Sequence, residues 1–128
     1  MLTLPYLGIS QAITWANKVE FEYNPYESNG LEWTGEVALG APDAFPYGEL
    51  SPRAFRLKTE KSYGRLVVSF DKPVPASQIW IVENYLPGRI TKVILFDENN
   101  DKYAAYDGKP QELDVPWRNF IIDLGKRT

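Results

Sequence analysis

The sequence predicts an all-β fold, a sandwich or barrel built from short strands. Apolar and polar residues alternate over several short runs, which is the pattern of half-buried strands. Clusters of Gly, Pro, Asn and Asp separate these runs, and no segment keeps the 3.6-residue apolar period of a helix. The chain has 128 residues, of which 44% are hydrophobic, so it can form one domain with its own core. We expect a single domain at residues 17–128, after an irregular lead-in at residues 1–16.

Several short runs are predicted as strands because they alternate or are rich in β-branched and aromatic residues. Besides the central pair described next, they are residues 17–23, 54–57, 65–70, 102–106 and 119–124. In the first of these runs, the alternation places Val19, Phe21 and Tyr23 on the inward face.

The centre of the predicted fold is a hairpin formed by residues 78–83 and 90–97. Both runs carry apolar residues on both faces, which is typical of strands that are covered on two sides. Between them stand Pro87 and Gly88, a strong turn signal, since Pro presets φ and Gly accepts a positive φ.

The composition excludes several classes of chemistry within this chain. It has no cysteine and no histidine, which excludes disulfides, thiol nucleophiles, Cys/His zinc sites and Ser-His-Asp catalysis. The net charge is −3, and no basic cluster exists beyond Lys126-Arg127, so a protein that neutralises nucleic-acid phosphates is not expected. No apolar run approaches the length of a membrane span. We therefore expect neither an enzyme nor a nucleic-acid binder.

A set of short motifs resembles one known family. The motifs are ALGAPD at residues 38–43, SPRAF at 51–55, LVVSFDKPV at 66–74 and ENYLPG at 83–88. In this order and spacing they resemble the galactose-binding-like (discoidin-type) jelly-roll modules, over roughly residues 15–124. The resemblance implies a jelly-roll-like antiparallel β-sandwich and a role in binding.

The chain departs from that family pattern at its C-terminus. Modules of this type usually continue beyond the last strand, predicted here at residues 119–124, with a further closing strand. Either the domain is shortened, or its closing strand comes from elsewhere. An open jelly roll exposes an unpaired sheet edge, which favours self-association or pairing with a partner's strand.

The loop of the central hairpin is the first candidate site. It presents Glu83, Asn84, Tyr85 and Arg89, which suit a ligand with neighbouring hydroxyl groups. The alternative is that the turn serves the fold alone, with Glu83 paired to Arg89 or accepting backbone amides.

Residues 40–52 form a second candidate, a Gly- and Pro-rich loop. Its two carboxylates, Asp43 and Glu49, could contribute to a structural Ca²⁺ site, although calcium normally requires more clustered oxygens. The alternative is that Asp43 organises the loop through local hydrogen bonds. We expect no cofactor, with structural Ca²⁺ as the open alternative.

Aromatic residues form a third candidate, because flat aromatic faces stack on sugar rings. Trp33 and Phe45 are expected in the core, whereas Tyr26 and Tyr47 stand beside prolines in polar loops and are expected at the surface. The alternative is that all of them anchor a β-rich core, where aromatics are enriched.

Two carboxylate pairs, Glu20/Glu22 and Asp97/Glu98, offer little for acid–base catalysis. The first pair is predicted on a solvent-facing strand surface and the second in a polar turn, and acidic turns are common without any catalytic role.

The expected function is a non-catalytic module that recognises carbohydrate or a glycan-bearing surface, with protein–protein interaction or assembly as the alternative. The candidate ligand-binding residues are Tyr26, Asp43, Tyr47, Arg53, Glu83, Asn84, Tyr85 and Arg89. We expect an extracellular or cell-surface location, although residues 1–12 make a poor signal peptide because they lack a basic start.

Overall fold

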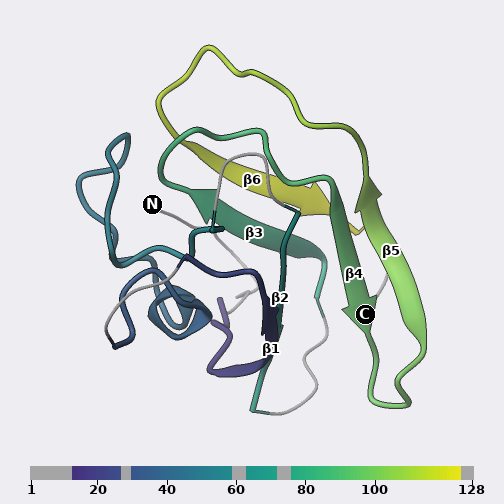
Figure 1. Ribbon diagram of the computed structural model, residues 1–128. Coiled ribbons are helices and arrows are strands. Elements are labelled where there is room, and N and C mark those ends of the chain that lie inside the picture. The colour runs from purple at the N-terminus through teal and green to yellow at the C-terminus, as the bar shows by residue number, and fades with distance from the viewer. Residues whose placement is uncertain (1–12, 27–29, 59–62, 72–75, 125–128) are drawn as a thin grey trace. The chain divides into compact units, whose positions relative to one another are not determined.

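The protein is an all-β structure with antiparallel strands, as the alternation predicts (Figure 1). The computed structural model describes residues 13–26, 30–58, 63–71 and 76–124. Within these ranges the chain forms two compact units. The first unit comprises the described residues within Met1–Asp43 and Pro52–Asp71, and the second comprises those within Ala44–Ser51 and Lys72–Thr128. The single domain expected at residues 17–128 stays a prediction, and residues 1–12 of the lead-in lie outside the described residues.

The first unit is organised by an antiparallel ribbon of two strands. Strand β1 (Lys18–Tyr23) pairs with β2 (Arg65–Ser69). Val19 faces Val68 and Phe21 faces Val67, so Glu20 is an extra residue that forms a β-bulge. The Glu20 carboxylate accepts a hydrogen bond of 2.6 Å from the Ser69 hydroxyl, which ties the bulge to the partner strand.

This bulge corrects the predicted faces of β1. Phe21 and Tyr23 were expected inward, but they are 44% and 52% exposed, while Glu22 is half-buried. An extra residue shifts the alternation by one position, so every side chain after it changes face. The sequence pattern has no means of showing where the ladder skips a residue.

A short 3-10 helix, η1 (Gly35–Ala38), packs on the ribbon. A Cβ atom at Gly35 would lie 2.5 Å from Leu66 Cδ1 and 3.2 Å from Val19 Cγ2, so glycine permits this close approach. The predicted strand at residues 54–57 is wrong, since that stretch forms only an isolated bridge between Leu57 and Pro25.

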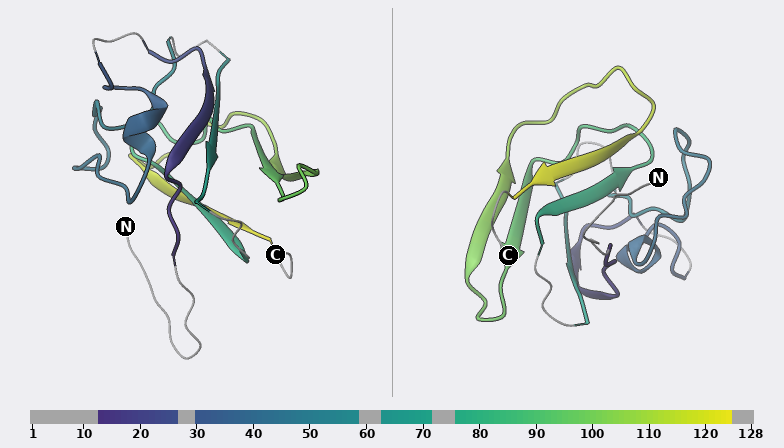
Figure 2. Two further views of the ribbon diagram at one scale, coloured as in Figure 1. Left: turned by 90° about the horizontal axis from the view of Figure 1, so that it is seen from below. Right: turned by 180° about the vertical axis from the view of Figure 1, so that it is seen from behind.

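The second unit contains two further antiparallel ribbons (Figure 2). Strand β3 (Gln78–Glu83) pairs with β6 (Arg118–Asp123), and β4 (Lys92–Phe96) pairs with β5 (Lys102–Asp107). The Tyr106 and Phe120 rings join the two ribbons in an edge-to-face contact at 4.9 Å. Ile122 and Leu124 are buried and form part of the core of this unit.

The predicted hairpin between residues 78–83 and 90–97 is therefore wrong, although both strands exist. The chain between β3 and β4 bonds to a later segment instead of closing a turn. The Gly88 carbonyl accepts from the Gln111 N–H, and the Thr91 carbonyl accepts from the Gly108 N–H. These bonds join the connection between β3 and β4 to the segment that precedes β6. The strand that pairs with β3 is therefore β6 and not β4.

The two strands also differ in how they are covered. Every residue of β3 after Gln78 is half-buried, in keeping with the expected apolar residues on both faces. Strand β4 instead alternates, with Ile94 at 41% and Phe96 at 49% exposure on its open face. The expectation that both strands are covered on two sides is thus wrong for β4.

The described residues hold no helix with the length and apolar character that a membrane span requires.

Candidate functional site

Three aromatic rings of the second unit form a continuous group, here called the aromatic platform: Phe45, Tyr47 and Trp117. Phe45 stacks on Tyr47 with centroids 4.8 Å apart and ring planes 26° apart. Tyr47 in turn contacts Trp117 at 4.7 Å. Phe45 is 64% exposed, while the other two rings are half-buried, so Phe45 is the outermost ring.

This arrangement reverses the predicted burial of two residues. Phe45 was expected in the core, but its ring lies at the surface. Tyr47 was expected at the surface, but its ring packs against both neighbours and its hydroxyl oxygen is buried. The reason is that Trp117, distant in sequence, provides the contact that draws Tyr47 inward.

Asn84 braces the loop that carries the platform. The Asn84 side-chain amide donates to the Glu49 backbone carbonyl at 2.9 Å, and the Asn84 backbone carbonyl accepts from the Gly48 N–H at 2.6 Å. Asn84 is 8% exposed. Both hydrogen bonds hold the loop at Gly48 and Glu49 in place, so Asn84 is a positioning residue for the platform.

Glu83, another predicted ligand residue, is engaged within the fold. Its Oε1 accepts from Arg118 Nε at 2.7 Å and forms an ion pair with Arg118 Nη2 at 2.6 Å, and its Oε2 accepts from the Gly88 N–H at 2.9 Å. The Glu83 side chain is 10% exposed. The carboxylate therefore fixes the loop after β3, in the way the structural alternative expects, but with Arg118 as its partner instead of Arg89.

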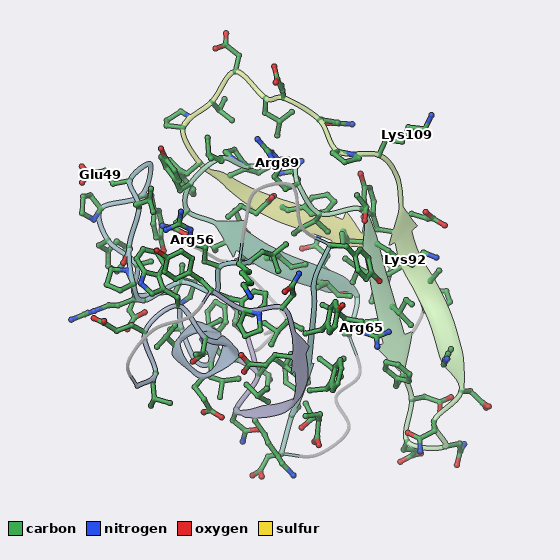
Figure 3. All side chains as sticks on the ribbon, in the orientation of Figure 1. Glu49, Arg56, Arg65, Arg89, Lys92 and Lys109 are labelled. Atoms are coloured by element: carbon green, nitrogen blue, oxygen red, sulfur yellow. The ribbon has the colours of Figure 1, made fainter. Side chains whose placement is uncertain are left out.

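Tyr85 and Arg89 are the members of this loop that face solvent. Tyr85 is 41% exposed and stands directly after the bracing Asn84. Arg89 is exposed, on the connection between β3 and β4 (Figure 3). Of the predicted residues of this loop, these two are the ones that a ligand can reach.

The remaining predicted residues, Tyr26, Asp43 and Arg53, belong to the first unit. Arg53 Nη1 lies 3.9 Å from Asp43 Oδ2, and both side chains are well exposed. A long contact between exposed groups contributes little to stability. Tyr26 packs in a different group, with Trp33 and Arg56.

No set of three acidic side chains gathers into a metal-binding cluster in the ranges that the structure describes. In the acidic turn at residues 97–101, Asp97 Oδ1 accepts from the backbone N–H groups of Asn99 and Asp101 at 2.8 and 2.9 Å. This carboxylate closes the turn between β4 and β5, which is the usual role of Asp at such a position.

The first unit also has an open polar hollow of about 480 Å³ at the end of the β1–β2 ribbon, beside Lys18, Glu20 and Ser69. These groups bond to one another, because Glu20 accepts from Ser69 and lies 3.7 Å from Lys18 Nζ. The hollow therefore offers few free polar groups to a ligand.

Sequence reasoning missed three residues that the structure brings forward: Phe45 as a surface ring, Trp117 and Arg56. Trp117 stands directly before β6 and directly after Pro116. An aromatic residue beside a proline is the sequence signal that could have pointed to it. Its contact with Tyr47 depends on the fold, because 69 intervening residues separate them in the chain.

Comparison of the chain with protein-family models, with curated proteins and with solved structures finds no match in any of the three.

Proposed function

We propose that the protein is a non-catalytic binding module whose aromatic platform binds carbohydrate. The observation that carries this proposal is the position of Phe45, which is 64% exposed while stacked on Tyr47. Its apolar face is open to solvent while Tyr47 and, behind it, Trp117 support it, and an exposed group of apolar rings of this kind is where a ligand can bind.

The chemistry of a sugar fits this ring. One face of a pyranose presents C–H groups that pack on an aromatic face, while its hydroxyl groups hydrogen-bond to polar side chains at the rim. Asn84 bonds the platform's loop, at Glu49, to the loop that carries exposed Tyr85. Glu49 is itself exposed and offers carboxylate oxygens as acceptors (Figure 3).

We further propose that the fold is the jelly-roll-like sandwich of galactose-binding-like modules and that the protein works outside the cell or at its surface. The support for both is the order of the motifs around residues 38–43 and 83–88. Both motifs lie in or next to the loops that build and brace the platform.

A glycan array followed by titration calorimetry on the best hit tests the platform. We expect Phe45→Ala to weaken binding by about tenfold or more, because loss of one stacked ring removes about 1.4 kcal/mol or more of binding free energy. The matched control is Phe96→Ala, which removes an exposed ring of the same kind from β4. No array hits, or equal effects of the two variants, would overturn the proposal.

Assembly through a sheet edge is the second candidate, and β4 favours it. Among the described residues every strand pairs with one other strand, β4 with β5, and one face of β4 also exposes Ile94 and Phe96. An unpaired edge with apolar side chains invites a further strand. Sedimentation at high concentration is expected to show self-association that Ile94→Lys abolishes, and a strictly monomeric wild-type protein would contradict this candidate.

A further inference from the structure

Arg56 of the first unit lies against two aromatic rings, in a group here called the Arg56 corner: Tyr26, Trp33 and Arg56. The guanidinium carbon is 4.4 Å from the Tyr26 ring centroid and 5.1 Å from the Trp33 centroid. The two centroids are 5.6 Å apart and the ring planes are inclined by 55°. Because the three separations are similar, the cation and the rings form a triangle, and the rings do not enclose the guanidinium from opposite sides.

Backbone hydrogen bonds hold all three residues of the Arg56 corner in place. The Tyr26 N–H donates to the Arg56 carbonyl at 2.7 Å, and the Arg56 N–H donates to the Trp33 carbonyl at 3.0 Å. The Trp33 N–H donates to the Pro52 carbonyl at 2.9 Å. Trp33 has a φ of 67°, a conformation that a bulky residue adopts only where its surroundings fix it. The corner is therefore pre-formed.

The charge of Arg56 is not balanced by the residues that the structure describes. No carboxylate or carbonyl among them accepts a hydrogen bond or forms an ion pair with its guanidinium, whereas Arg118 is paired with Glu83. The side chain is half-buried, and it carries five N–H donors in a planar fork. A fixed, partly desolvated cation with free donors is suited to bind an anion.

We propose that the Arg56 corner binds the carboxylate of a small ring-shaped acid, of which a uronic acid sugar is the type. A planar carboxylate matches the guanidinium fork through two parallel hydrogen bonds. One guanidinium balances one negative charge, which favours a carboxylate over a phosphate dianion. The Tyr26 and Trp33 rings lie beside the cation, and they can pack on the C–H groups of a saturated ring. The Arg56 corner shares no residue with the aromatic platform, and this proposal does not depend on the function proposed for the platform.

The first test is an NMR titration of the wild-type chain with glucuronate, glucose and acetate. We expect glucuronate to shift the Arg56 Nε–H and the Trp33 indole N–H signals saturably, with a dissociation constant on the order of millimolar. Glucose lacks the carboxylate and acetate lacks the ring, so each binds more weakly than glucuronate. Equal shifts with glucose, or no shift at either signal, overturn the proposal without any variant.

The second test uses Arg56→Lys, which keeps the charge but loses the fork. We expect it to weaken glucuronate binding by about tenfold, because a lysine cannot form the bidentate pair. The matched control is Arg65→Lys, since Arg65 also lies over an aromatic ring, that of Phe21 at 5.1 Å, but at an exposed position. Unchanged affinity in Arg56→Lys, or an equal loss in the control, contradicts the assignment.

Discussion

Two carboxylate–arginine pairs of this protein have the same chemistry and different roles. Glu83 Oε1 lies 2.6 Å from Arg118 Nη2, and the two side chains are 10% and 24% exposed. The Glu83 carboxylate also accepts a hydrogen bond from the Gly88 N–H. Asp43 Oδ2 lies 3.9 Å from Arg53 Nη1, and the two side chains are 55% and 68% exposed. Both carboxylates were predicted to bind a ligand, but only the second remains open to one.

The difference shows that burial, and not residue type, decides what a carboxylate does. Removal of one partner of a buried pair leaves the other charge in a poorly solvated place, which is costly. Water screens an exposed pair and solvates either partner when the other is lost. The buried pair is therefore expected to stabilise the loop after β3, and the exposed pair to leave stability almost unchanged.

The largest expected effect comes from Glu83→Ala. We expect the free energy of unfolding to fall by about 3 kcal/mol, because Arg118 loses its partner and the Gly88 N–H loses its acceptor. Urea unfolding followed by circular dichroism measures this loss. Glu83→Gln keeps an acceptor for Gly88 and is expected to lose less. A loss under about 1 kcal/mol for the alanine variant would show that the pair is not a stabilising contact.

Next in size is Gly88→Ala, which probes the same loop without changing charge. Gly88 has a φ of 99°, and a Cβ atom there would collide with the Gln111 carbonyl oxygen. We expect a loss of about 2 kcal/mol from strain and collision together. The matched control is Gly40→Ala, at a φ of 78° with no atom within 4 Å of the added Cβ. It is expected to cost about 1 kcal/mol from strain alone. Equal losses would mean that the Gln111 backbone moves away from the added Cβ atom without a measurable cost.

The smallest expected effect is that of Asp43→Asn. We expect a change within about 0.5 kcal/mol, because the pair with Arg53 is long and exposed. Urea unfolding at low and high salt measures it, and added salt is expected to reduce any difference further. A loss that approaches that of Glu83→Ala would contradict the distinction drawn between the two pairs.

Most strands could be predicted from the sequence, whereas their partners could not. Residues 65–70, 78–83 and 119–124 lie within one residue of the observed β2, β3 and β6. Alternation and β-branched content are local properties, so they identify a strand without reference to the rest of the chain. Pairing depends on long-range contacts, and the Pro87-Gly88 turn signal predicted a β3–β4 hairpin that the bonds of Gly88 to Gln111 replace.

The candidate site could be predicted in part. Tyr47, Asn84 and Tyr85 belong to the two loops that build and brace the aromatic platform. The sequence presented these loops as two separate candidates, and the structure shows that Asn84 joins them. Phe45 was expected in the core, whereas its ring is 64% exposed. The burial of Tyr47 depends on Trp117, 70 positions later in the chain, and no local pattern contains that information.

The sequence by itself determined that this is an all-β protein, that it lacks histidine and thiol chemistry, and where most strands lie. These properties follow from composition and from local periodicity. Only the tertiary structure decided which strands pair, which face of β1 is inward after its bulge, and which predicted ligand residues are already engaged. The physical reason is that burial and hydrogen-bond partners are set by segments far apart in the chain, as Glu83 and Arg118 show.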